Sequence, residues 1–138
     1  MTEIHDGSCL CGAVRFRARG EMREVIACHC TQCRKQTGHY LAATNVADEN
    51  LTLEGDESLR WYRASSFARR GFCGNCGSVL FWKADSESYT SITAGSFEKP
   101  TGLKLTVHIF CADKGDYYDI DDGLPQYAAG SPGLAVDG

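Results

Sequence analysis

The sequence predicts an all-β fold organised around bound metal. Apolar residues recur mostly with a period of two, short candidate strands are separated by turn residues, and most of the eight cysteines lie in close clusters. A chain of 138 residues has the usual length of one domain. We therefore expect a single β domain over residues 1–127 and a loosely ordered tail over residues 128–138.

The expected strands are rich in β-branched and aromatic residues, with Gly, Asp, Ser or Pro between most of them. Alternation marks three short strands by the pairs Val14 and Phe16, Leu51 and Leu53, and Leu59 and Trp61. Further strands are expected at residues 66–72, 78–82, 89–94 and 105–111. One short helix is expected at residues 31–38, with Thr31 as its N-cap and Gly38 at its end.

Composition argues against several classes of protein. The chain has 14 Lys and Arg against 18 Asp and Glu, and this balance of -4 disfavours nucleic-acid binding driven by bulk charge. Its longest apolar runs have four residues, far below the ~20 of a membrane-spanning helix. The acidic N-terminal segment MTEIHD does not resemble a secretory signal. We expect a cytoplasmic protein with no nucleic-acid or membrane partner, and the sequence does not indicate its oligomeric state.

The cysteine spacings favour metal binding over disulfides. A reducing cytoplasm makes disulfides uncommon, and close neighbours do not bridge one another comfortably. Neighbouring thiols at these spacings can instead share one ion. The clustered cysteines are Cys9, Cys11, Cys28, Cys30, Cys33, Cys73 and Cys76.

Two of the clusters are pairs. In the segment 72–78 (FCGNCGS), Gly74 and Gly77 allow the backbone to curl so that both sulfurs face one ion. A thioredoxin-like redox pair is the alternative, but such a pair needs a helix, and a strand is expected here. Cys9 and Cys11 point to the same side of an extended segment, so they could supply the second pair of a closed four-thiolate site or simply pack in a strand.

The third cluster, Cys28, Cys30 and Cys33, offers three thiols, which would leave one tetrahedral position open for a substrate atom or water. In the alternative, a distant side chain closes this site. The candidates for that ligand are Cys111, His108, His29 and His39.

Alternation over residues 105–111 predicts that Cys111 is a core thiol on the face of Val107 and Ile109. His108 would lie on the opposite face, where it either approaches the metal or forms ordinary hydrogen bonds. His29 lies between two thiols, and we expect its ring to point away from them into solvent.

The segments GSCLCGAVRF (7–16), CHCTQCRK (28–35) and FCGNCGS (72–78) occur in an order that resembles the glutathione-dependent formaldehyde-activating enzyme family, which includes the centromere protein V group. HIF (108–110) and DGLPQY (122–127) resemble the closing elements of that family, so the similarity covers roughly residues 5–127. KGDYY (114–118) departs from the pattern, because the family often has a lysine followed by a small residue, proline and tryptophan. The departure affects the expected wall of the substrate pocket.

The resemblance implies an Mss4-like β-tent of short antiparallel strands with two zinc ions and one short helix. It assigns Cys9, Cys11, Cys73 and Cys76 to a structural zinc site. It assigns Cys28, Cys30 and Cys33 to a catalytic zinc site. The implied reaction is that of a zinc-dependent carbon–sulfur lyase on a thiol adduct such as S-hydroxymethylglutathione, formed from glutathione and formaldehyde.

Three thiolate ligands exceed the +2 charge of zinc, which weakens its power to activate water and favours a thiol substrate over hydrolysis. Glutathione carries two carboxylates, and Arg34 and Lys35 directly follow the last cysteine, so both are candidate substrate-binding residues. Their alternative role is a solvated helix face. Further candidate cations are Arg63, Arg69 and Arg70.

Two other function classes remain open from the sequence. One is a non-catalytic zinc module that serves structure or interaction, and the other is a redox or rubredoxin-like iron protein that uses the same thiolates. A fourth protein ligand at the site of Cys28, Cys30 and Cys33 would favour the non-catalytic zinc module. A coloured purified protein would favour the iron protein.

Overall fold

The computed structural model describes residues 3–130, and the chain forms two compact units within them. The first unit holds residues 3–23 and Thr44–Gly102, and the second holds Glu24–Ala43 and residues 103–130. Most of the expected tail, 128–138, lies outside the described residues, and a single domain over residues 1–127 stays a prediction. No helix in the described range has the length and apolar character needed to cross a membrane.

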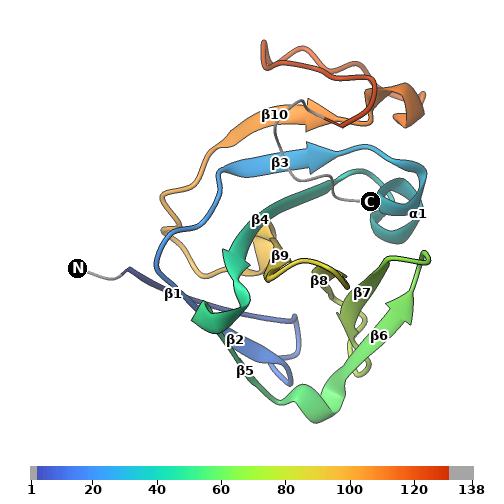
Figure 1. Ribbon diagram of the computed structural model, residues 1–138. Coiled ribbons are helices and arrows are strands. Elements are labelled where there is room, and N and C mark those ends of the chain that lie inside the picture. The colour runs from blue at the N-terminus through green and yellow to red at the C-terminus, as the bar shows by residue number, and fades with distance from the viewer. Residues whose placement is uncertain (1–2, 131–138) are drawn as a thin grey trace. The chain divides into compact units, whose positions relative to one another are not determined.

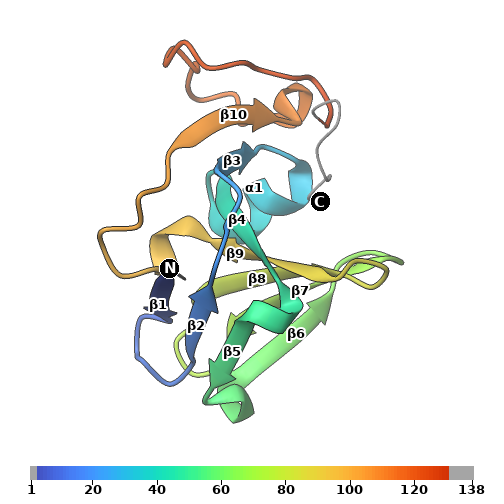
Figure 2. The same ribbon diagram turned by 60° about the vertical axis from the view of Figure 1, so that its left-hand side comes forward.

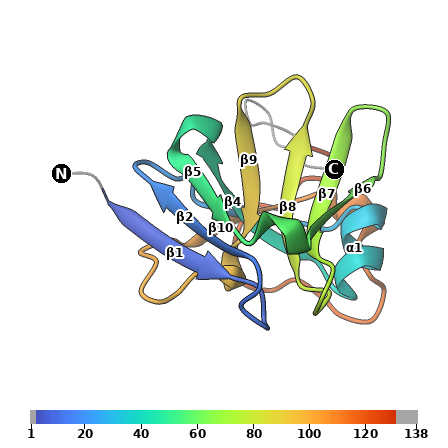
Figure 3. The same cartoon turned by 90° about the horizontal axis from the view of Figure 1, so that it is seen from below.

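The structure is mostly β with one short α-helix, which confirms the predicted fold class. In the first unit, a three-stranded antiparallel sheet has the order β1-β2-β5 (Figure 3). Its strands are β1 (Ile4–Ser8), β2 (Arg15–Arg19) and β5 (Leu51–Glu54). The same unit contains a run of antiparallel strands in the order β9-β8-β7-β6 (Figure 2). These are β6 (Leu59–Arg63), β7 (Ala68–Cys73), β8 (Val79–Ala84) and β9 (Tyr89–Thr93).

Three single turns of 3-10 helix also lie in this unit, namely η1 (Asp48–Asn50), η2 (Asp56–Ser58) and η3 (Ala94–Ser96). Strand β4 (Leu41–Ala47) is divided, with its first three residues in the second unit and the rest in the first.

In the second unit, β3 (Val25–Cys28) pairs with β10 (Leu105–Ile109) on one side and with the start of β4 on the other. The β3–β10 pair is parallel, whereas we expected antiparallel strands only. Helix α1 (Thr31–Thr37) follows β3 directly (Figure 1), and the 3-10 turn η4 (Cys111–Asp113) follows β10.

The helix confirms the predicted segment but corrects its N-cap. Cys30, not Thr31, holds the N-cap position, and its sulfur accepts a hydrogen bond from the backbone N–H of Cys33 at 3.3 Å. Gly38 ends the helix with φ 81°, a left-handed conformation that glycine adopts without strain.

Each expected strand segment corresponds to a strand, but the last one ends early. Phe110 has φ 55°, so β10 stops at Ile109 and Cys111 begins η4 as a half-buried residue. The prediction that alternation carries Cys111 onto the core face was therefore wrong. Strands β1, β3 and β4 were not predicted, and β3 shows why, because its four residues are all buried and give no alternation.

Phe16 lies at the centre of the apolar core of the first unit. Its ring packs against those of Phe81 and Phe97, with centroids 5.5 and 5.1 Å away. Gly7 is the cross-strand partner of Phe16, and the Phe16 ring fills the space where a Gly7 Cβ would lie. The β1–β2 pair therefore depends on this glycine for its close packing.

Gly7→Ala should lower the free energy of unfolding by about 1–3 kcal/mol, because the added methyl group overlaps the Phe16 ring and the packed core resists movement. Urea unfolding measures this change. Gly95→Ala is the matched control, since no atom lies near its Cβ position and its φ is not positive, and it should change stability little. Equal stability of the two variants would contradict the packing role of Gly7.

Candidate metal centres and the adjoining cavity

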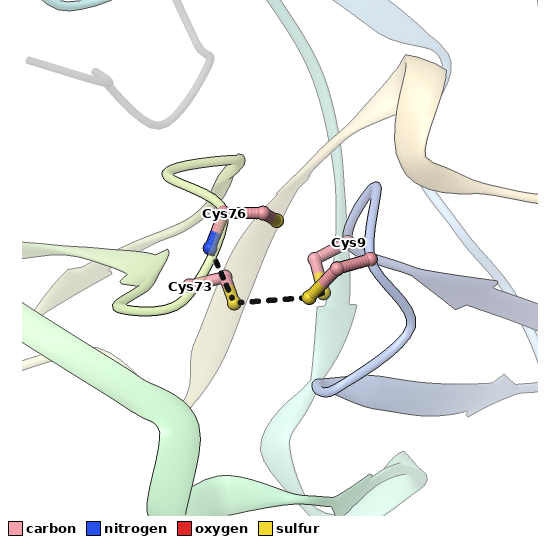
Figure 4. A group of neighbouring side chains, drawn as sticks. Cys9, Cys73 and Cys76 are labelled. Carbon is pink, nitrogen blue, oxygen red and sulfur yellow. Dashed lines mark hydrogen bonds between the residues drawn. The ribbon is translucent and has the colours of Figure 1, made fainter.

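Two tight turns of the first unit bring four thiols together. Cys9 and Cys11 lie on the turn that follows β1, while Cys73 ends β7 and Cys76 lies on the next turn. Ligand atoms of all four residues lie within 4.8 Å of one another. Figure 4 shows the sulfurs of Cys9 and Cys73 facing each other from these two segments. This is the grouping that the family resemblance implied.

The spacing of these thiols fits a tetrahedral zinc ion. The Cys9 and Cys11 sulfurs are 3.7 Å apart, and those of Cys11 and Cys73 are 3.9 Å apart. Zinc–sulfur bonds of about 2.3 Å place tetrahedral ligands about 3.8 Å from one another. The donor set and the distances therefore match.

Backbone N–H groups point at the sulfurs and stabilise their negative form. Val14 N–H donates to Cys9 Sγ at 3.3 Å, and the N–H groups of Asn75 and Cys76 both donate to Cys73 Sγ at 3.4 Å. A hydrogen bond with Ser78 Oγ lowers the pKa of Cys76 to about 5. Such donors favour thiolates, which are the form that binds metal.

The second group consists of three buried thiols within one short segment of the second unit. Cys28 ends β3, Cys30 caps α1, and Cys33 lies in the first turn of that helix. Their sulfurs also lie within 4.8 Å of one another. Hydrogen bonds with the Cys30 and Cys33 thiols, together with burial, raise the pKa of Cys28. Three thiols this close can hold a metal ion.

Within residues 3–130, no histidine, cysteine or acidic side chain adds a fourth ligand atom to this group. Cys111 lies outside both clusters, and the His39 ring pairs with the hydroxyl of Tyr117. The rings of His29 and His108 hydrogen-bond to each other. The four candidates for a closing ligand are thus all placed elsewhere in the described structure.

His29 corrects another expectation, because it is not solvated. Only 1% of the residue is exposed, and both ring nitrogens are hydrogen-bonded. Burial, and then the facing His108, lower the pKa of His29 to about 4, so its ring is neutral at pH 7. Sequence analysis missed Tyr118 and Asp122, which belong to the same network, because these residues lie far from His29 in the chain.

A cavity of about 420 Å³ in the second unit adjoins the end of α1. Its lining residues are Arg34, Gly38, Lys114, Gly115, Asp116 and Tyr117. Arg34 comes directly after Cys33, and its Nε donates to the carbonyl of Asp113 at 3.2 Å. Lys35 is exposed and does not line the cavity.

The other candidate arginines belong to the first unit. Arg63 pairs with Asp85, the guanidinium of Arg69 stacks on Trp61, and Arg70 is buried in β7. Lys114 is a cavity cation that sequence analysis did not single out. Its Nζ donates to the carbonyls of Gly115 and Tyr118.

Comparison with known proteins agrees with the residues that carried the resemblance. A family model described as glutathione-dependent formaldehyde-activating enzyme matches residues 4–113. The chain is 30% identical over 116 residues to an uncharacterized lyase of Schizosaccharomyces pombe, covering 83% of this chain and 84% of that protein. It is also 30% identical over 129 residues to a putative glutathione-dependent formaldehyde-activating enzyme of Halomonas elongata, covering 84% and 80%.

A crystal structure of a Rhodobacter sphaeroides protein has a TM-score of 0.60 to this chain at 23% identity, covering 70% of this chain and 91% of that one. At this identity the likeness concerns the fold alone. The family model, by contrast, spans most of the sequence and includes both cysteine groups. The chain therefore belongs to the glutathione-dependent formaldehyde-activating enzyme family.

Proposed function

We propose that this protein is a zinc-dependent carbon–sulfur lyase-type enzyme that acts on a thiol adduct such as S-hydroxymethylglutathione. The observation that carries the proposal is the group of three buried thiols with no fourth protein ligand among residues 3–130. The names of the relatives, a lyase and a formaldehyde-activating enzyme, support the same class of reaction. A cytoplasmic location and weak nucleic-acid binding, both expected from the sequence, belong to this proposal.

The two cysteine groups would have different roles. Cys9, Cys11, Cys73 and Cys76 would hold a structural zinc ion, because four protein thiols complete a tetrahedron. Cys28, Cys30 and Cys33 would hold a catalytic ion. Zinc at this second site would favour the ionised form of a substrate thiol.

The reaction needs no other reagent. In the lyase direction, the carbon–sulfur bond of the hydroxymethyl adduct breaks and its electron pair stays on sulfur. The hydroxyl group loses its proton as the carbonyl of formaldehyde forms, and the sulfur ends as a thiol with one proton. Addition of the thiol to the aldehyde is the reverse of these steps.

Arg34 would bind a substrate carboxylate. Its Nε is held by the carbonyl of Asp113, and its terminal nitrogens have no protein partner among the described residues. A guanidinium fixed at one nitrogen loses less conformational freedom when it pairs with a carboxylate. Lys35 would contribute less, because its exposed side chain is flexible and well hydrated.

The activity test mixes glutathione and formaldehyde and follows S-hydroxymethylglutathione by NMR exchange, with the protein-free rate as reference. Zinc-loaded protein should accelerate the exchange, and Cys33→Ser should abolish the acceleration. Cys111→Ser makes the same chemical change at a thiol outside both groups and should leave the rate unchanged. No acceleration by the wild-type protein with two bound zinc ions would refute this substrate pair.

The two zinc sites should differ in their effect on stability. Cys76→Ser weakens a site that joins segments 62 residues apart, so the melting temperature should fall by about 10 °C or more. Cys33→Ser changes a site built from one segment and should keep the fold while zinc drops from two ions to one. Thermal melts with zinc counts on both variants test this difference. If Cys33→Ser melts as low as Cys76→Ser, the second site is structural.

Arg34→Ala should raise the KM for glutathione about tenfold with little change in kcat, because it removes a charge-assisted contact of about 1.4 kcal/mol. Lys35→Ala should have a smaller effect. Lys99→Ala removes an exposed cation of the first unit and serves as control. An unchanged KM in Arg34→Ala would remove this residue from substrate binding.

A further inference from the structure

Four polar side chains of the second unit form one continuous hydrogen-bonded chain. Asp122 Oδ2 lies 2.7 Å from His108 Nε2, and His108 Nδ1 lies 2.9 Å from His29 Nε2. The Tyr118 hydroxyl lies 2.8 Å from the remaining nitrogen of His29, Nδ1. His29 and His108 are 1% and 3% exposed, so the middle of this hydrogen-bonded chain is buried. The bonds use all four nitrogens of the two rings.

The carboxylate sets the direction of every bond in this chain. Asp122 is ionised, because the hydrogen bond from His108 lowers the pKa of its carboxyl group, and a carboxylate only accepts. With one proton on each imidazole ring, His108 donates from Nε2 and accepts at Nδ1. His29 in turn donates from Nε2 and accepts at Nδ1, which leaves Tyr118 as the donor of its hydroxyl proton. All buried donors and acceptors of both rings are satisfied.

The hydrogen-bonded chain reaches the cysteine segment at His29. Cys28 already pairs with Leu41 and Ile109 in the sheet, and the chain adds side-chain bonds to these backbone contacts. His29 lies between Cys28 and Cys30, and its ring is fixed at both nitrogens. Its backbone N–H also donates to the carbonyl of Ile109. Asp122 is itself held, because its Oδ1 accepts the backbone N–H of Leu124 at 3.0 Å. These side-chain bonds link the cysteine segment to a residue far along the sequence, in addition to the pairing of β3.

We propose that Asp122 and His108 are positioning residues that act through His29, so that the chain Asp122–His108–His29–Tyr118 holds Cys28 and Cys30 in the geometry that retains a metal ion. This inference rests on the proposed zinc binding by Cys28, Cys30 and Cys33. The three thiols come from one short segment and close no long loop. A closed site gains rigidity from distant ligands. Here the His29 ring, which lies between two ligands, would add rigidity to that given by the pairing of β3.

The test measures zinc release from the purified, zinc-loaded protein to a chromogenic chelator. Cys33→Ser should retain only the four-cysteine ion, so its single release phase identifies that ion in the other variants. Asp122→Ala removes the acceptor at the end of the chain. We expect one of its two ions to leave at least about tenfold faster than in the wild type, with the four-cysteine ion released at an unchanged rate.

Asp122→Asn should restore release close to the wild-type rate. Its amide can accept from or donate to His108, and the rings can adopt the matching tautomers, so the chain stays complete. Asp121→Ala is the matched control, because it removes an exposed acid one residue away and should behave as the wild type. Tyr118→Phe breaks the chain at its other end, should also speed release, and carries the test if Asp122→Ala does not fold.

Each contrary result has a distinct meaning. Wild-type release rates for both ions in Asp122→Ala and Tyr118→Phe would overturn the positioning role while leaving the zinc proposal intact. Equal acceleration of both ions, or a failure of Asp122→Asn to restore release, would also overturn it, since each indicates general destabilisation. A wild-type protein with a single zinc ion would refute the proposed function itself, and with it the ion that the chain is inferred to hold.

Discussion

The convergence of four sulfurs from two turns joins the two sheets of the first unit. Its strands β1, β5 and β7 have five, four and six residues, and strands of this ordinary length need sheet partners and a packed face for stability. The turn after β1 meets the turn after β7 at the sulfurs of Cys11 and Cys73, which are 3.9 Å apart and 62 residues distant in sequence. The apolar core of the same unit packs around Phe16, whose ring contacts those of Phe81 and Phe97.

The second unit solves the same problem in a different way. Its three thiols lie within one segment, so the ligands themselves join no distant parts of the chain. Beyond the pairing of β3 with β4 and β10, a side-chain connection comes from His29, whose ring nitrogens bond to His108 in β10 and to Tyr118 beyond it. Because His29 anchors this site without being a ligand, the site needs only three protein ligands. The fourth position of a bound metal ion would then be open to a substrate.

Sequence reasoning reached what local patterns encode. Alternation located β2, β5 and β6, and cysteine spacing with the family resemblance led to the two groups that the structure brings together. It failed where a property depends on distant partners or on one backbone angle. β3 is buried on both faces, Phe110 turns the chain before Cys111, and the burial of His29 follows from residues 79 and 89 positions away. None of these features has a signature within a short window of sequence.

The segment after β10 explains how the cavity and the cysteine segment are connected. Apart from η4, residues 110–127 form no helix or extended strand. Backbone hydrogen bonds tie residues 125–129 to β10 and η4, and polar side chains hold the residues between. Lys114 lines the cavity and donates to the carbonyl of Tyr118, while the hydroxyl of the same tyrosine binds His29. The cavity wall and the Cys28–Cys30 segment therefore share one anchor. A substitution in this loop can therefore change the lining of the cavity without displacing β3, provided that the Tyr118 hydroxyl still bonds to His29.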